Sequence, residues 1–173
     1  MIDGLVVDAC VACTAGNPKD GTPDQQRRCR DVLLVITQGK SCVLLFSASL
    51  YFEWSRHQSD FAVEWLAVMK SRGRVQIVNV PRPQLLRRII KTAQGRMVRD
   101  AIRKDFHLIE AALCSNSPRV ISRDNQIRRR FREAAIEVKD IRSVIWSNPD
   151  DQKDDTVGWL TSGASPRDDL MLG

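Results

Sequence analysis

The strongest constraint on the fold is the alternation of short apolar runs with longer segments of helical periodicity. Strands that alternate with helices pair in parallel through crossover connections. The sequence therefore predicts an α/β fold, a three-layer α/β/α sandwich around a central, mainly parallel sheet. Buried strands are expected at 5–9 and 42–47, an alternating strand at 74–80, a short strand at 119–124 and a final strand at 141–146. Helices are expected at 24–39, 48–58, 60–73, 83–104 with a break near Gly95, 105–117 and 125–135.

Charge is distributed unevenly along the chain. The formal net charge of the 173 residues is +6, but residues 148–173 carry −4, which leaves +10 for residues 1–147. A basic body of this size favours an anionic partner, most commonly nucleic acid, although it also fits a solvated basic surface. We therefore predict one folded domain over residues 1–147 and an acidic, flexible C-terminal tail over residues 148–173, part of which Trp159 and Leu160 could pin to the body. One hypothesis is that this tail shields the basic face or the site.

Several classes of protein are disfavoured by the composition. No apolar run approaches the roughly 18 to 20 residues of a membrane span. The start, "MIDGLVVDACV", has an acid where a secretory signal has basic residues, so a cytoplasmic protein without membrane binding is expected. The five cysteines are odd in number, and neither of the two histidines has ligand spacing to a cysteine pair. We therefore expect no zinc site.

The C-x-x-C pair of Cys10 and Cys13 raises the alternative of a thiol redox protein. Such a pair is reactive when it begins a helix, because the helix N-terminus lowers the thiol pKa. Here Cys13 leads into "TAGNP", which predicts a loop, so we expect both cysteines to be structural. We likewise expect His57 and His107 to have packing or surface roles rather than to transfer protons.

Four acids are expected to meet at one edge of the sheet. Asp8 and Asp124 follow the first and fourth strands, Asp105 opens the helix before the fourth strand, and Glu53 lies one turn into the helix after the second. Taken singly, Asp105 and Asp124 also fit helix N-caps, and Glu53 fits an exposed helix residue. Ligands of open parallel sheets bind beyond the carboxyl ends of the strands. Clustered carboxylates favour a cation, and Mg²⁺ and Mn²⁺ prefer such oxygen ligands.

The segments "VVDACV", "SLYFEWSRH", "KDFHLIEAAL" and "RVISRDNQIRRRF" resemble the four acidic motifs of the PIN-domain nucleases. The resemblance covers residues 4–146 and implies a metal-dependent endoribonuclease. It implies that Asp8, Asp105 and Asp124 hold one or two Mg²⁺ or Mn²⁺ ions, with Glu53 a ligand directly or through a metal-bound water. It also implies the toxin of a toxin–antitoxin pair, an antitoxin protein that blocks the acidic pocket, and a homodimer. The basic segment 82–104 and the acidic tail exceed a minimal toxin of this family.

Polar residues beside the acids complete the predicted site. Ser122 and Asn125 are candidates for orienting the carboxylates, although both also fit hydrogen bonding at a strand end and a helix start. Arg123, Arg128, Arg132 and Lys104 are candidates for contacts to RNA phosphates, which give affinity without sequence choice. The alternative function is an RNA-binding module or scaffold that is catalytically weak or inactive.

Overall fold

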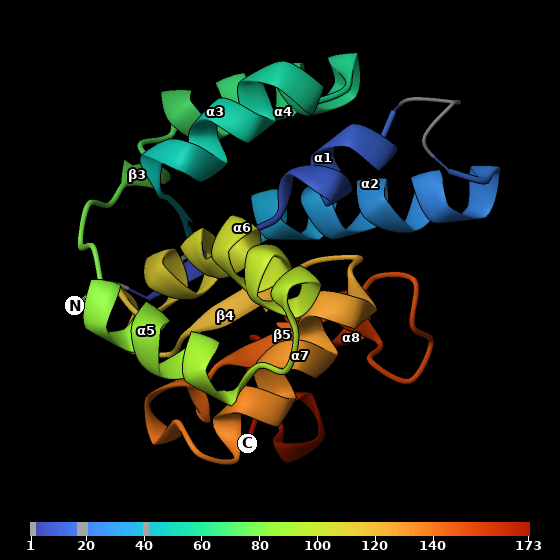
Figure 1. Ribbon diagram of the computed structural model, residues 1–173. Helices are drawn as coiled ribbons and strands as arrows, with labels where there is room; N and C mark the ends of the chain where they lie inside the picture. Colours follow the sequence, from blue (N-terminus) through green and yellow to red (C-terminus); the bar gives the residue numbers. More distant parts are fainter. Residues whose placement is uncertain (1–2, 17–20, 40–41) are drawn as a thin grey trace.

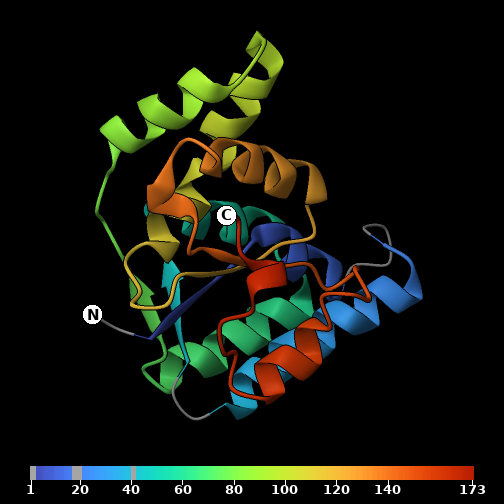
Figure 2. The same ribbon diagram turned by 90° about the horizontal axis from the view of Figure 1, so that it is seen from below.

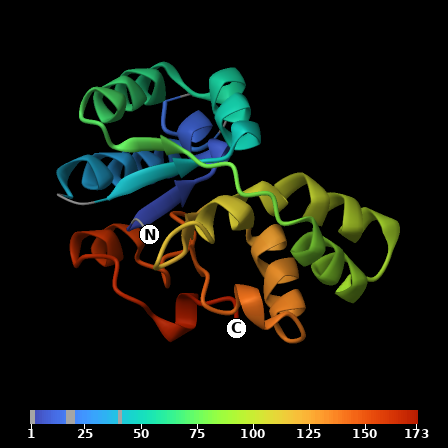
Figure 3. The ribbon, with the colours of Figure 1, turned by 90° about the vertical axis from the view of Figure 1, so that its left-hand side faces the viewer.

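The computed structural model describes residues 3–16, 21–39 and 42–173, and its central feature is a five-stranded parallel sheet. The strands are β1 (Gly4–Val7), β2 (Val43–Phe46), β3 (Val75–Ile77), β4 (Arg119–Ile121) and β5 (Ile145–Ser147). They pair in the order β3-β2-β1-β4-β5, and every pairing is parallel. Figure 3 shows β1, β2 and β3 pointing in one direction. The predicted α/β class and its parallel sheet are confirmed.

Helices cover both faces of this sheet. They are α1 (Ala9–Thr14), α2 (Pro23–Gln38), α3 (Ala48–His57), α4 (Asp60–Ser71), α5 (Pro83–Thr92), α6 (Arg96–Ala112), α7 (Asn125–Ala135) and α8 (Thr156–Thr161). Two short 3₁₀ helices lie at Lys139–Ile141 and Asp168–Leu170. Figure 2 shows α5, α6 and α7 on one side of the sheet and α2, α4 and α8 on the other. No helix in the described part of the chain has the length and apolar character needed to cross a membrane.

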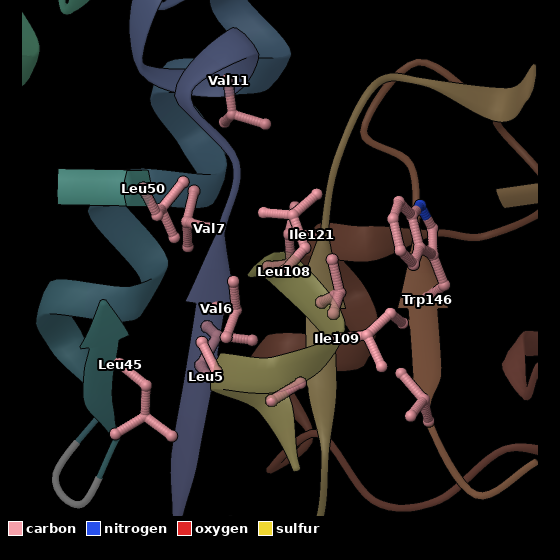
Figure 4. Packing of buried hydrophobic residues seen from close by; sticks show 14 of the residues in the cluster. Leu5, Val6, Val7, Val11, Leu45, Leu50, Leu108, Ile109, Ile121 and Trp146 are labelled. Carbon is pink, nitrogen blue, oxygen red and sulfur yellow. The ribbon is translucent and has the colours of Figure 1, made fainter. Parts of the chain in front are cut away.

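The core forms where the central strands meet these helices. All four residues of β1 and all three of β4 are buried, as expected for parallel strands covered on both faces. Figure 4 shows Val6 of β1 and Ile121 of β4 beside Leu108 and Ile109 of α6. Thus α6 lies across β1 and β4, and this position places polar residues of α6 near the ends of these two strands.

Two local differences from the sequence prediction concern helices beside the acids. A short helix, α1, lies between β1 and the loop expected from Thr14 on, because the Asp8 side chain caps this helix and Val11 is buried beneath it. Residues 17–20 of that loop lie outside the described part of the chain. The helix expected to begin at Asp105 begins at Arg96, directly after Gly95, whose positive φ of 84° ends the preceding turn. Asp105 therefore lies inside α6, and the N-cap interpretation of Asp105 is wrong.

The C-terminal segment also differs from the predicted flexible tail. It forms α8, which contacts α2, and it buries Trp159, Leu170 and Leu172. Met171 pairs with Ile145 in an antiparallel bridge beside β5. The structural reason is that β5 and α2 leave apolar surface that these side chains cover. Residues 148–173 thus pack onto the body; Figure 1 labels α8, and Figure 2 shows it beside α2.

Candidate functional site

Asp8 and Asp124 lie at the point where the strand order reverses. From β1 the chain builds the sheet toward β3, then returns to place β4 on the other side of β1. In open α/β sheets this switch point leaves a crevice beyond the strand ends, where ligands bind. Asp8 is the residue after β1, and Asp124 lies three residues after the end of β4.

A single hydroxyl group links these two acidic positions. Ser122 Oγ donates to Asp8 Oδ2 at 2.6 Å and accepts from the backbone N–H of Asp124 at 3.1 Å. Asp124 Oδ1 in turn accepts from the N–H groups of Gln126 and Ile127 and caps α7. Ser122 is fully buried, so its geometry is fixed by the surrounding strands. The structure therefore brings Asp8, Ser122 and Asp124 together at the end of β1 and β4.

Asp105 reaches the same region from α6. Burial raises the pKa of its carboxyl to about 6, Lys104 opposes this rise, and the charges of Asp8 and Asp124 add to it. The Asp105 carboxyl is therefore within electrostatic range of Asp8 and of Asp124. Concentrated negative charge at a partly buried position favours binding of a cation or of a proton.

Glu53 lies beside a histidine rather than beside the other acids. Its Oε2 stands 3.6 Å from Nε2 of His107, which brings α3 and α6 together. The His107 ring is buried, and its Nδ1 lies 2.8 Å from the backbone oxygen of Lys104. Because that oxygen only accepts, Nδ1 carries a proton and donates it. The packing role expected for His107 thus comes with a contact to a predicted site residue.

The Cys10 thiol is a further neighbour of Asp8. Its Sγ donates to Asp8 Oδ2 at 3.1 Å, and the N–H of Arg123 donates to the same sulfur at 3.4 Å. Contrary to the sequence argument, Cys10 lies in the first turn of a helix, yet burial and then the Asp8 charge raise its thiol pKa well above the ordinary range. Such a thiol stays protonated, unlike the activated thiol of a redox motif.

The arginines predicted to contact RNA are paired within the molecule. Arg123 Nε donates to Asp150 at 2.7 Å, and Arg128 Nη1 donates to Asp154 at 2.6 Å in a buried ion pair. Arg132 donates to the backbone oxygens of residues 169 and 171 at 2.6 and 3.1 Å. These three side chains therefore bind the C-terminal segment in this structure.

Lys104 and Asn125 lie in more accessible places. Lys104 is exposed on α6, directly before Asp105, and its charge acts on that carboxyl. Asn125 is the first residue of α7 and lines a cavity of about 440 Å³ with Arg128 and Arg132. Other basic side chains of α5 and α6 are also exposed: Arg87, Lys91, Arg96, Arg99 and Arg103. The accessible positive charge near Asp105 thus comes mainly from these two helices.

The donor set suits a hard divalent cation, although the ligands do not form a closed cage. Within the described residues, no three side chains of His, Cys, Asp or Glu stand close enough together to hold an ion. Mg²⁺ and Mn²⁺ are commonly held by one or two carboxylates, with water and substrate phosphate completing the shell. This mode fits the charges of Asp8, Asp105 and Asp124. It also fits the buried Nε2 of His107, which has no hydrogen-bond partner.

Sequence reasoning did not find the roles of His107 and Cys10. The contact between His107 and Glu53 joins residues 54 positions apart, and no local pattern signals it. The Cys10 contact had a local signal, since an acid that caps a helix faces the residue two positions on. Comparison of this chain with models of known protein families, with characterised proteins and with solved structures gives no match.

Proposed function

We propose that this protein is a metal-dependent endoribonuclease that cleaves RNA phosphodiester bonds. The observation that carries the proposal is the Ser122 hydroxyl at the sheet's switch point, which joins the Asp8 carboxylate to the backbone N–H of Asp124, with Asp105 in electrostatic range of both acids. The resemblance of the four acidic segments to PIN-domain nucleases supports the same activity. Mg²⁺ or Mn²⁺ is the proposed cofactor.

Each side chain has a distinct part in the proposed mechanism. Asp8, Asp105 and Asp124 would hold the ion, and Ser122 would orient Asp8 through its 2.6 Å hydrogen bond. When bound, a divalent ion activates water for attack on phosphorus and stabilises charge on the leaving oxygen. Lys104 and the exposed basic residues of α5 and α6 would position the RNA backbone beside Asp105.

The central test is the substitution Asp8→Asn. Asparagine Oδ1 can still accept from the Cys10 N–H and cap α1, and its Nδ2 can donate to Ser122 Oγ, so the fold is retained while a charged ligand is lost. We expect cleavage of single-stranded RNA with Mg²⁺ or Mn²⁺ to fall by at least about 100-fold, since losing even an outer-shell partner commonly costs 10- to 100-fold. Asp31→Asn, which removes an exposed carboxylate of α2, is the matched control. Equal cleavage by both variants would exclude the proposed site.

A second candidate function is RNA binding without catalysis. It is favoured by the lack, among the described residues, of a preformed group of three metal-ligating side chains. It predicts that the wild type and Asp8→Asn bind RNA equally, that neither cleaves it, and that neither binds Mn²⁺.

The proposed biological role is that of a toxin neutralised by an antitoxin protein. Such an antitoxin would cover the acidic edge of the sheet, and the expected result is loss of RNA cleavage on co-purification with the product of a neighbouring small reading frame. A homodimer is also proposed, with the exposed Phe52 of α3 and Val63 of α4 as candidate contacts. Light scattering during gel filtration tests this assembly.

A further inference from the structure

One buried polar atom beside this site, Nε2 of His107, has no part in the proposed mechanism. His107 is 8 % exposed, and its Nε2 has no hydrogen-bond partner in the structure. Buried polar atoms are nearly always satisfied, so an exception calls for an explanation such as an ion. The atom that Nε2 faces is Oε2 of Glu53, at 3.6 Å.

The tautomer of this ring is fixed by its other nitrogen. Nδ1 lies 2.8 Å from the backbone oxygen of Lys104 and donates its proton there. In the neutral ring, Nε2 therefore carries a lone pair directed toward Glu53. A histidine that donates one ring N–H to a backbone carbonyl and presents the other nitrogen to an acid has the usual arrangement of a metal ligand.

The distance between the two side chains distinguishes this arrangement from a direct hydrogen bond. An N–H···O hydrogen bond has a separation of about 2.7 to 3.2 Å, and the observed 3.6 Å exceeds it. Two ligand atoms on one ion, each bonded at about 2.1 Å, lie about 3.0 to 3.5 Å apart. The observed separation is closer to the second case.

We propose that His107 Nε2 and Glu53 Oε2 together bind a divalent transition-metal ion, so that the site prefers Mn²⁺ and similar ions to Mg²⁺. The inference rests on the proposed function in that Glu53 is one of the four acids of the nuclease motifs. Imidazole nitrogen is a softer ligand than carboxylate oxygen and favours transition metals, whereas Mg²⁺ prefers oxygen and keeps its water. Glu53 is partly exposed, which leaves the outer side of the ion open to water or an RNA phosphate.

The direct experiment is pulsed EPR of Mn²⁺ bound to the full chain, without a histidine tag. The expected signal is the coupling of a directly bonded ¹⁴N nucleus. The chain has two histidines, His57 and His107, so the coupling must persist in His57→Gln and disappear in His107→Gln. His57 is exposed at the end of α3, which makes it the matched control. Bound Mn²⁺ without nitrogen coupling in the wild type would overturn the proposal even if His107→Gln failed to fold.

Affinities give the second measurement. In His107→Gln we expect Mn²⁺ to bind at least about 10-fold more weakly. This is the lower end of the loss in metal affinity when a residue that supports a metal ligand is replaced. Mg²⁺ affinity should change far less, and His57→Gln should match the wild type for both ions. Equal weakening of Mn²⁺ and Mg²⁺, or no weakening, would contradict the proposal.

Cleavage of RNA in Mg²⁺ alone separates this inference from the proposed nuclease function. Cleavage by the wild type without nitrogen coupling in the Mn²⁺ form would leave the nuclease proposal standing and exclude the His107 ligand. Nitrogen coupling without cleavage in either Mg²⁺ or Mn²⁺ would support the metal ligand and exclude the nuclease. Absence of Mn²⁺ binding would exclude the His107 ligand, whatever the result in Mg²⁺.

Discussion

At the scale of single residues, the site is defined by carboxylates whose charge has little compensation within the chain. Asp105 is the clearest case, because burial and the charges of Asp8 and Asp124 outweigh the favourable effect of Lys104 on its pKa. Its ionised form therefore destabilises the metal-free fold. A bound cation would remove this cost, which links the stability of the protein to its proposed cofactor.

The pH dependence of stability tests this link. The Asp105 pKa rises from 3.8 to about 6 on folding, so between these values the folded protein binds more protons than the unfolded chain. The contribution of Asp105 to stability therefore falls as pH rises through this window and stays low above it. Without metal, we expect the free energy of unfolding of Asp105→Asn to exceed that of the wild type by on the order of 1 kcal/mol at pH 7.5, a figure discounted for partial exposure. At pH 4 the two free energies should match.

Urea denaturation in chelator at the two pH values measures this difference, with Asp31→Asn as the exposed control. Mn²⁺ should then stabilise the wild type more than Asp105→Asn. A variant less stable than the wild type at pH 7.5 would show that the carboxylates do not repel one another.

At the scale of elements, the sequence predicted every strand and the break at Gly95, because these depend on local apolar runs and on a glycine. It misplaced features that depend on tertiary contacts. Nothing between Arg96 and Ala112 stops a helix, so Asp105 did not need to begin one. The C-terminal segment has the acidic composition of a tail, yet Trp159, Leu170 and Leu172 bury themselves against the body. The sequence offered Trp159 and Leu160 as anchors, but the average composition of the segment does not reveal Leu170 and Leu172.

This docking predicts a large cost for removing one anchor. Trp159 is 3 % exposed, and its Nε1 donates to the backbone oxygen of Ser165 at 2.8 Å. We expect Trp159→Ala to lower the free energy of unfolding by about 3 to 5 kcal/mol, the usual cost of truncating a buried aromatic residue. Leu160→Ala, at a half-buried position of the same helix, should cost clearly less. Denaturant midpoints measure both, and two unchanged midpoints would restore the flexible-tail interpretation.

At the scale of the whole molecule, the acidic C-terminal segment neutralises part of the basic body. The sequence indicated the imbalance of charge between residues 1–147 and 148–173, and it suggested that the acidic segment shields the basic face. It did not indicate which charges meet, because Arg123 and Asp150 are 27 positions apart and are brought together by β4 and β5. The exposed basic residues of α5 and α6 remain as the surface open to a polyanion.

Release of Arg123 should therefore strengthen RNA binding. Asp150→Asn removes the carboxylate that accepts from Arg123 Nε at 2.7 Å, whereas Asp168→Asn removes an exposed carboxylate of the same segment. Both variants change the net charge equally, so a difference between them reports the loss of the Arg123–Asp150 ion pair, while Arg123 keeps its hydrogen bond to Thr14. In an Asp8→Asn background that prevents cleavage, we expect Asp150→Asn to bind single-stranded RNA more tightly than Asp168→Asn. One additional phosphate contact should steepen the plot of log affinity against log salt by about 0.7. Equal affinities and equal salt slopes would mean that Arg123 stays on the protein and that the acidic segment acts only through its net charge.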